Sequence, residues 1–558
     1  MITLQEGKSK KVPGSSSIFF KMDFYDPYVF SFLVQSDGSV YDKVNKVFEF
    51  PINHLYFIAD FLLHYGDISF IPMGDANSKA DIEISCKDYK YPPYKHQVEA
   101  IKYGINRNSG WLLLDDCGLG KTVSMIYLAE ELHKREGLEH CFIICGVNGL
   151  KYTWQDEVHK YSNLDCCILG EKVSRNGKKS IVSVPERLAI LKSKIDEFFV
   201  ITNIETLQSK EFADTFKKSK NKFDMIVLDE AHHAKNPTSQ SGKTLMKLKA
   251  KRCIALTGTV IMNVPENAFV PLKWTGNTSS TYSDFKHLFN IYGGFGGKQI
   301  LGFKNLDILQ ELISSCSLRR LKSDVLDLPP KTYRTEYVEM GKEQRRVYDE
   351  VAEGVLAELD LLDHKPTILE EMTINMRLRQ ITAFPGSLST TTTQSAKLDR
   401  MCELVDDIVA QGDKVVVFGT FKSAVKEAYR RLSKYNPVIC TGDNTDDEIN
   451  RSKRIFDDSN SGCKVFCATW QKMGTGHTLT SANYLIFIDT PWTRADYDQA
   501  TDRIYRIGQT KPVFIINLVT KDSYDERVSE IVEMKEALSG YVVDNKSQEK
   551  LNMLGERA

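Results

Sequence analysis

The sequence predicts an α/β protein with two lobes, each built around a sheet of parallel strands. Two observations support this fold class: short apolar strands alternate with helical stretches, and this alternation occurs twice, within residues 111–256 and again within 414–518. Such alternation is typical of parallel sheets, because the connection between parallel strands has to cross from one end of the sheet to the other. Two similar series of strands therefore imply two similar lobes.

The expected strands are short runs rich in apolar and β-branched residues, which is typical of strands buried on both faces. In the first lobe they are 111–114, 141–145, 198–202, 225–228 and 253–256. In the second lobe they are 414–418, 437–440, 465–468, 484–488 and 513–518.

The remaining segments lie before, between and after the lobes. Residues 41–51 read as a hairpin and 52–66 as an amphipathic helix, which indicates a separate module at the N-terminal end. The predicted segments are a small N-terminal α+β accessory module (1–90), the first lobe (91–264), helical insertions with an inter-lobe linker (265–400), the second lobe (401–522) and a C-terminal helix or tail (523–558).

Composition places the chain among globular multidomain proteins. With 558 residues, 42% of them hydrophobic, and a net charge of −1, it can bury several cores, and its overall charge neither supports nor excludes a nucleic-acid partner. The twelve cysteines are scattered and show no paired CxxC spacing, which favours reduced thiols over a zinc site. No apolar window approaches the ~18 residues of a membrane span. We expect a soluble intracellular protein, cytoplasmic if its host is bacterial.

The segment Asp115–Thr122 (DDCGLGKT) directly follows a predicted strand and precedes a helical pattern. Small residues at this place let backbone N–H groups close on phosphates, and the following helix directs its positive end at them. Lys121 would contact the β- and γ-phosphates, and the Thr122 hydroxyl would hold Mg²⁺. A turn with a helix cap is the alternative. The residues expected around the nucleotide are Asp115, Asp116, Cys117, Gly118, Leu119, Gly120, Lys121 and Thr122.

Asp229 and Glu230 stand at the carboxyl end of the apolar strand in MIVLDEAH. Ligands of open α/β sheets bind at this end of the strands. Asp229 would orient Mg²⁺, and Glu230 would position and polarise the attacking water. Acidic residues that cap a helix are the alternative, but together with the phosphate loop the motif favours an ATP site.

Arg503 and Arg506, in QATDRIYRIGQ, are three residues apart and are therefore predicted on one helical face. Two guanidinium groups there could stabilise the charge on a transferring γ-phosphate. A solvated basic face is the alternative interpretation.

The ordered blocks of the chain resemble the Swi/Snf-type family within helicase superfamily two, from about Tyr91 to Val528. The blocks that carry the resemblance are PYKHQ, DDCGLGKT, VITNIETL, LDEAHHAKN, LTGTVIMN, SLRRLKSDVLDLPPK, VVVFGTF and DQATDRIYRIGQTKPV. The resemblance implies two tandem RecA-like lobes that use ATP with Mg²⁺. It also implies that Gln97 reads adenine, that Gly474 and Gly476 allow close backbone approach in the second lobe, and that Thr257 and Thr259 couple the ATP site to DNA.

The sequence departs from the family pattern at three positions. Gly146 stands where the family usually has Pro, Val260 replaces Pro after LTGT, and Thr475 replaces Leu. None of these changes removes a group that would touch phosphate or metal. Trp154 and Trp492 lie in family blocks, and we interpret them as packing residues.

DNA contacts are expected mainly with phosphates, which carry no sequence information. Thr202 and Thr420, each at a strand end, are the hydroxyl candidates. Lys249 and Lys251 belong to a basic cluster with Lys243, Lys247 and Arg252, and a second cluster contains Arg319, Arg320 and Lys322. Solvated helix faces are the alternative for both clusters.

The function predicted from these motifs is that of an ATP-dependent translocase on double-stranded or branched DNA, acting as a monomer without sequence specificity. It would remodel or anneal DNA structures or displace DNA-bound proteins. Residues 1–90 resemble the accessory domain of annealing helicases, although aromatic core packing is the alternative for their ring-rich stretch. A strand-separating helicase and a nucleotide-regulated scaffold with little turnover are the other hypotheses.

Overall fold

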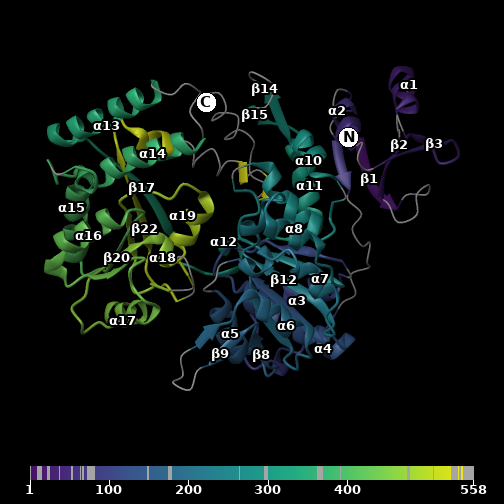
Figure 1. Ribbon diagram of the computed structural model, residues 1–558, viewed down its shortest axis with the longest axis horizontal. Coiled ribbons are helices and arrows are strands. Elements are labelled where there is room, and N and C mark those ends of the chain that lie inside the picture. Colours follow the sequence, from purple (N-terminus) through teal and green to yellow (C-terminus); the bar gives the residue numbers. More distant parts are fainter. Residues whose placement is uncertain are drawn as a thin grey trace. The chain divides into compact units, whose positions relative to one another are not determined.

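The computed structural model divides the chain into two compact units (Figure 1). Unit 1 comprises Met1–Val325 and Ala537–Ala558, and unit 2 comprises Leu326–Glu536. The structure describes residues 2–8, 16–21, 26–36, 38–51, 55–62, 65, 68–71, 82–107, 109–146, 150–173, 179–262, 264–278, 280–293, 299–360, 368–389, 391–473, 478–506, 508–529, 538–539 and 542–543. No helix in these ranges has the length and apolar character needed to cross a bilayer.

The N-terminal module is a five-stranded sheet in the order β3-β4-β2-β1-β5 with two helices. Its elements are β1 (Ile2–Lys8), β2 (Ser16–Lys21), α1 (Pro27–Gln35), β3 (Val40–Asp42), β4 (Val47–Pro51), α2 (Leu55–Leu62) and β5 (Ile68–Ile71). The predicted hairpin is confirmed as the antiparallel pair β3–β4, and the predicted helix as α2. Phe20, Phe48 and Phe50 are fully buried, so these rings form a core.

This module packs on the first lobe within unit 1. Strand β5 lies against α11 (Leu306–Cys316), and α2 lies against α10 (Tyr282–Phe289). Apolar residues of the module, such as Leu4 and Leu33, belong to the same hydrophobic cluster as Phe285 of α10 and Leu309 of α11. The segment predicted as a separate module is therefore joined to the first lobe through a shared core.

The first lobe contains a seven-stranded sheet in the order β16-β6-β13-β12-β7-β11-β8, and every strand pair in it is parallel. Its strands are β6 (Trp111–Leu113), β7 (His140–Cys145), β8 (Cys166–Ile168), β11 (Phe199–Asn203), β12 (Phe223–Asp229), β13 (Arg252–Leu256) and β16 (Ser317–Leu318). All five predicted strands are present. Strands β8 and β16, with three and two residues, were not predicted.

Helices cover both faces of this sheet. Side chains of β6 alternate between two cores: Leu112 belongs to one hydrophobic cluster, and Trp111 and Leu113 belong to the other. The further helices of the lobe are α3 (Lys95–Ile105), α4 (Lys121–Glu136), α5 (Leu150–Tyr161), α6 (Val184–Lys192), α7 (Phe212–Lys217), α8 (Gln240–Lys247), α9 (Phe269–Trp274) and α12 (Lys322–Val325). Two short hairpins are formed by β9 (Glu171–Val173) with β10 (Lys179–Ile181) and by β14 (Asn290–Gly293) with β15 (Gln299–Phe303).

Unit 2 contains a six-stranded parallel sheet in the order β17-β22-β21-β18-β20-β19. Its strands are β17 (Lys331–Val338), β18 (Val415–Gly419), β19 (Val438–Cys440), β20 (Val465–Thr469), β21 (Tyr484–Phe487) and β22 (Val513–Thr520). Its helices are α13 (Lys342–Asp360), α14 (Ile368–Ala383), α15 (Ala396–Ala410), α16 (Lys422–Arg431), α17 (Asp446–Asp457), α18 (Trp470–Met473) and α19 (Arg494–Thr501). The five predicted strands are again present.

The segment 265–400, predicted as insertions and linker, is shared between the two units. Its first part completes unit 1 through β16 and α12, and its second part supplies β17, α13 and α14 to unit 2. Strand β17 pairs with β22 along its whole length. Its sequence KTYRTEYV is largely polar because β17 is a mostly exposed edge strand, and for that reason it was not predicted.

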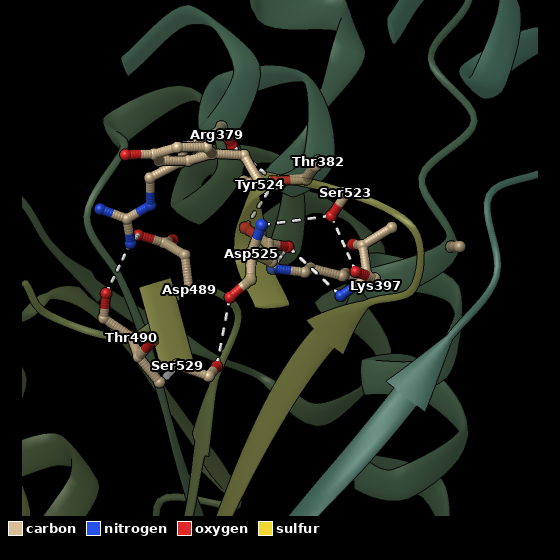
Figure 2. Close-up of polar contacts among 12 residues, drawn as sticks. Arg379, Thr382, Lys397, Asp489, Thr490, Ser523, Tyr524, Asp525 and Ser529 are labelled. Atoms are coloured by element: carbon tan, nitrogen blue, oxygen red, sulfur yellow. Dashed lines mark hydrogen bonds and ion pairs between the residues drawn. The ribbon is translucent and has the colours of Figure 1, made fainter. Parts of the chain in front are cut away.

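A buried ion pair fastens the helices of this segment to the sheet of unit 2 (Figure 2). Lys397 of α15 lies 2.6 Å from Asp525, and the two side chains are 1% and 6% exposed. The Asp525 carboxylate also accepts bonds from the Thr382 hydroxyl of α14, at 3.0 Å, and from the Thr520 N–H at the end of β22. One carboxylate therefore connects α14, α15 and β22.

Arg379 of α14 makes a second connection. Its guanidinium donates to the Thr490 carbonyl at 2.5 Å, lies 3.7 Å from the Asp489 carboxylate, and stacks over Trp492 at 4.5 Å. Figure 2 shows Arg379 pointing toward Asp489 and Thr490. Trp492 thus packs against a buried cation, in agreement with its predicted packing role.

Lys397→Met is expected to destabilise unit 2, because the substitution leaves the buried Asp525 carboxylate without its charged partner. The expected loss is about 3–5 kcal/mol in the free energy of unfolding, measured by denaturant titration with a probe in unit 2. Lys521→Met is the control, since its partner Glu339 is exposed and the pair should contribute little. Equal stability of the two variants would contradict the anchoring role of Lys397.

Candidate nucleotide site

The phosphate loop connects β6 to α4 at the carboxyl edge of the first-lobe sheet. Gly118 and Gly120 have φ angles of +87° and +78°, a region that favours glycine. The helix that follows begins at Lys121, so its free N–H groups face the loop. Backbone donors and the positive end of α4 are therefore placed as phosphate binding requires.

Lys121 is buried, and its Nζ donates to the Asp115 carbonyl at 2.9 Å. Burial by itself lowers the pKa of this ammonium, but electrostatic interactions with Cys117, Glu230 and Asp229 outweigh that effect and raise it. Lys121 therefore stays charged beside the strand-end acids, which is the state needed to bind phosphate.

Asp115 and Asp116 are held by the segment that follows β16. Arg320 forms two bonds to the fully buried Asp115 carboxylate, at 2.9 and 2.5 Å, and also donates to the His96 carbonyl. Arg319 lies 2.8 Å from the Asp116 carboxylate. Asp115 stands where the generic loop has Gly because it is the partner of a buried arginine.

This pairing corrects the interpretation of the second basic cluster. Arg320 and Lys322 are buried, and the Lys322 N–H donates to Asp116 at 3.0 Å. The cluster is directed at the phosphate loop and does not form an exposed patch. Sequence could not reveal this, because Arg320 and Asp115 are 205 positions apart.

Gln97 lies against the phosphate loop, at the start of α3. Its Oε1 accepts the Tyr94 N–H at 2.9 Å, and a Cβ added at Gly120 would lie 2.6 Å from its Nε2. His96, its neighbour, bonds the Leu119 carbonyl at 2.8 Å through Nε2. Gln97, which is predicted to read adenine, therefore lies beside the phosphate loop.

Asp229 is the last residue of β12 and Glu230 follows it, as predicted, and the Asp229 carboxylate is held from two sides. Its Oδ2 accepts the Trp154 indole N–H at 2.8 Å, and its Oδ1 accepts the Glu230 N–H at 2.9 Å. Burial and the neighbouring Glu230 charge raise the pKa of Asp229 to about 6, against the opposing effects of Trp154 and Lys121. Glu230 itself has a φ of +51°, an uncommon conformation for a residue with a side chain.

Gly146, one of the departures from the family pattern, lies directly against these acids. Its N–H donates to the Asp229 carbonyl at 2.9 Å, a bond that proline could not make. A Cβ at position 146 would lie 2.8 Å from the Glu230 carbonyl oxygen. The glycine therefore permits a close approach between the end of β7 and the acidic turn.

A polar chain leads from Glu230 to the LTGT loop after β13. His232 Nδ1 lies 3.3 Å from Glu230 Oε2 and 3.1 Å from Thr257 Oγ1, so a proton on Nδ1 satisfies both. Burial lowers the pKa of His232 to about 3, which keeps the ring neutral. Thr257 Oγ1 in turn accepts the Thr259 N–H at 3.1 Å. Both threonines are thus connected to the acidic turn.

The residues present fit a magnesium ion that arrives with a nucleotide. Thr122, in the first turn of α4, offers a hydroxyl that makes no hydrogen bond within the described part of the chain, and Asp229 offers a carboxylate. Mg²⁺ prefers such oxygen ligands, takes few of them from the protein and keeps phosphate oxygens and waters. No group of three or more His, Cys, Asp or Glu side chains suited to a metal occurs among the described residues.

In unit 2 the predicted helical face of Arg503 and Arg506 is wrong. Helix α19 ends at Thr501, and both arginines lie in the turns that follow. The Gln509 amide donates to the carbonyls of Ile504 and Ala482, and these bonds hold the chain after α19 in a non-helical turn. Arg503 is buried, whereas Arg506 is half-buried and donates weakly to the Thr478 hydroxyl at 3.4 Å.

The predicted DNA contacts differ in how their side chains are engaged. Thr202 is 2% exposed and donates to the Thr206 hydroxyl at 3.0 Å, so its own hydroxyl is engaged within the protein. Thr420 accepts the Trp470 indole N–H at 3.1 Å, which leaves its proton available to donate. Gly474, Thr475 and Gly476 lie outside the described residues.

The first basic cluster is exposed except at its end. Lys249 is exposed, whereas Lys251 forms an ion pair of 2.5 Å with Glu136. Arg252 is fully buried and pairs with the same carboxylate at 2.7 Å. Arg252 is therefore a structural residue, and Lys249 remains a better candidate for a ligand contact than Lys251.

Comparison with known proteins identifies two domains. Residues 94–387 match the SNF2-related domain, and residues 396–508 match the helicase conserved C-terminal domain. An uncharacterised ATP-dependent helicase of Mycoplasma pneumoniae is 26% identical over 516 residues, which cover 89% of this chain and 47% of that protein. The putative ATP-dependent helicase/translocase YwqA of Bacillus subtilis is 27% identical over 482 residues, with 80% and 48% covered. The chain spans about half the length of the curated relatives it matches.

Among solved structures, the chain is similar to the Sulfolobus solfataricus SWI2/SNF2 ATPase core in complex with dsDNA. The sequence identity is 24%, and the match covers 84% of this chain and 98% of that chain with a TM-score of 0.37.

Gly120→Ala is expected to weaken nucleotide binding strongly, because the added Cβ meets the Gln97 amide and distorts the phosphate loop. Gly137→Ala is the matched control: its φ is +69°, but a Cβ there meets nothing within 4 Å. Both variants should lose about 1–2 kcal/mol of stability from the left-handed backbone. Only Gly120→Ala should lose affinity for a fluorescent ADP analogue, and equal affinities would contradict the assigned loop.

Proposed function

The chain belongs to the SNF2-related family, and from this premise we propose that it is a DNA-dependent ATPase that translocates along double-stranded DNA. The observation that carries the proposal is the meeting of Lys121, Asp229 and Glu230 at one edge of the first-lobe sheet. Lys121 is buried, and its interactions with Asp229 and Glu230 raise the pKa of its ammonium group, so the side chain stays charged beside both acids. This combination suits the hydrolysis of a nucleoside triphosphate.

Each residue of the site would have a defined part in hydrolysis. Lys121 and the backbone of the phosphate loop would bind the phosphates, while Thr122 and Asp229 would hold the magnesium ion. Mg²⁺, when bound, neutralises charge on the phosphates. Glu230 would orient the attacking water and take up its proton, since its carboxylate is next to a neutral His232. Arg506, with Arg503, would stabilise the charge of the transition state.

Double-stranded DNA is the proposed track. The LTGT and QATDRIYRIGQ blocks resemble those of DNA motors more than those of RNA helicases, and SLRRLKSDVLDLPPK resembles the Swi/Snf type, which favours a translocase over a strand-separating enzyme. Thr420 and Lys249 are the contacts that we favour, since the Thr420 proton and the Lys249 side chain are available to phosphates. Remodelling or annealing of branched DNA, with the N-terminal module as the accessory element, is the specific activity that we propose to test.

The test is ATP hydrolysis by the purified chain alone and with duplex DNA, forked DNA, single-stranded DNA or RNA. Stimulation by duplex DNA that falls as salt concentration rises would support a translocase that contacts phosphates. Stronger stimulation by forked than by duplex DNA would support a role of residues 1–90 in the recognition of branched DNA. Stimulation by single strands together with displacement of a labelled strand would favour a strand-separating helicase, and absence of turnover would favour a scaffold.

Lys121→Ala and Glu230→Gln are each expected to reduce DNA-stimulated hydrolysis by on the order of 100-fold or more, because phosphate binding and water activation are lost. Lys134→Ala, on the exposed side of the same helix α4, is the control and should hydrolyse ATP normally. The measurement is steady-state phosphate release with saturating duplex DNA. Normal turnover by either site variant would refute the assignment.

Arg506→Ala is expected to slow hydrolysis by on the order of 1,000-fold while nucleotide affinity stays unchanged, because an arginine finger acts mainly on the transition state. Arg430→Ala, which removes an exposed side chain paired with Glu427, is the control in the same unit. Single-turnover hydrolysis and equilibrium binding of an ADP analogue separate the two effects. A loss of affinity without a loss of rate would assign Arg506 to ground-state binding instead.

A further inference from the structure

Trp154 of α5 carries a polar contact that its predicted packing role does not explain. The side chain is 1% exposed, and its indole N–H donates to Asp229 Oδ2 at 2.8 Å. The other carboxylate oxygen accepts the Glu230 N–H at 2.9 Å. One donor on each oxygen fixes the plane of the Asp229 carboxylate.

Two other tryptophans of unit 1 provide a comparison within the same molecule. Trp111 and Trp274 are also almost fully buried, yet their indole nitrogens have no hydrogen-bond partner in the described part of the chain. Buried aromatic area is therefore sufficient at those two positions. At position 154 the N–H has a charged acceptor, and hydrogen bonds to ionised groups are about twice as strong as neutral ones.

The chemistry of indole suits a supporting role beside a metal ligand. Its nitrogen is a donor only, so it cannot coordinate a cation itself or lose its proton to the carboxylate. The side chain comes from α5, whereas Asp229 ends β12, so the bond joins two rigid elements that are 75 positions apart in sequence. Glu230 lies beside Asp229 and repels it, so the donor on Oδ2 matters for the orientation of the Asp229 carboxylate.

We propose that Trp154 is a positioning residue that orients the Asp229 carboxylate toward the magnesium ion of the bound nucleotide. The proposal rests on the proposed ATP site. It assigns Trp154 an effect on the affinity for Mg²⁺ that is separate from its contribution to packing, because groups that orient metal ligands commonly change metal affinity by about 10–100-fold.

The experiment compares Trp154→Phe with Trp274→Phe in the full chain. Both substitutions keep a buried aromatic ring and remove an indole N–H, but among the residues that the structure describes only the Trp154 N–H has a partner. Binding of a fluorescent ADP analogue is measured while Mg²⁺ is titrated, and again in EDTA. Trp154→Phe should raise the Mg²⁺ concentration at half-saturation about 10-fold or more and leave binding in EDTA unchanged, whereas Trp274→Phe should change neither.

A second measurement uses the unsubstituted side chain, so it does not depend on how well Trp154→Phe folds. The five tryptophans are replaced by 5-fluorotryptophan, and the ¹⁹F resonances are assigned from single substitutions at the other four positions. Addition of Mg²⁺ with ADP should shift the Trp154 resonance more than addition of ADP in EDTA, and it should leave Trp274 unmoved. A Trp154 resonance that ignores Mg²⁺, or equal Mg²⁺ affinities of the two phenylalanine variants, would overturn the proposal.

The outcomes also separate this proposal from the proposed function. A wild-type chain that binds Mg²⁺ with ADP but shows no hydrolysis with any nucleic acid would refute the translocase and still allow Trp154 to be tested. A wild-type chain that binds no ADP in the presence of Mg²⁺ would refute both.

Discussion

The buried ion pair between Arg320 and Asp115 holds the phosphate loop of unit 1 against the last strand of its sheet. Neither side chain can be left alone in the core, because an unpaired buried charge costs several kcal/mol. The pair therefore requires that the segment after β16 stay with unit 1, although 205 residues separate the partners. Pairing of β16 with β6 sets the register, and Arg319 and the Lys322 N–H fix the neighbouring Asp116. The boundary at Val325, where the chain passes from unit 1 to unit 2, follows from this constraint.

The other loops of the site lie very close to one another. These contacts require either glycine, which has no Cβ, or a side chain that donates a hydrogen bond. Gly146 lets the end of β7 touch the acidic turn, and a Cβ at Gly258 would lie 3.0 Å from Cys117 Sγ of the phosphate loop. Trp154 adds a bond from α5 to Asp229. The loops after β6, β7, β12 and β13 thus meet at one edge of the sheet, where ligands of parallel sheets bind.

The sequence predicted the fold well wherever the signal was local. All ten strands expected from apolar runs are present, and the DDCGLGKT and LDEAH segments occupy the predicted strand ends. Prediction failed where distant partners decide the outcome. The polar edge strand β17 exists because β22 pairs with it. Arg503 and Arg506 lie in turns because the Gln509 amide bonds the carbonyls of Ile504 and of the distant Ala482. The Trp154 bond to Asp229 has no local pattern, since it joins two elements far apart along the chain.

Unit 2 uses buried charge for a different purpose from that of unit 1. Lys397, Asp525 and Arg379 bind no predicted ligand; they fasten α14 and α15 to the sheet, which makes residues 326–400 part of this unit. The Asp489 carboxylate that faces Arg379 also accepts the Thr420 N–H, at 3.0 and 3.1 Å to its two oxygens. The position of the Thr420 hydroxyl, which Trp470 orients from the other side, therefore depends on the anchor in α14. A contact to a nucleic-acid phosphate at Thr420 would for this reason be sensitive to substitution of Arg379 in α14.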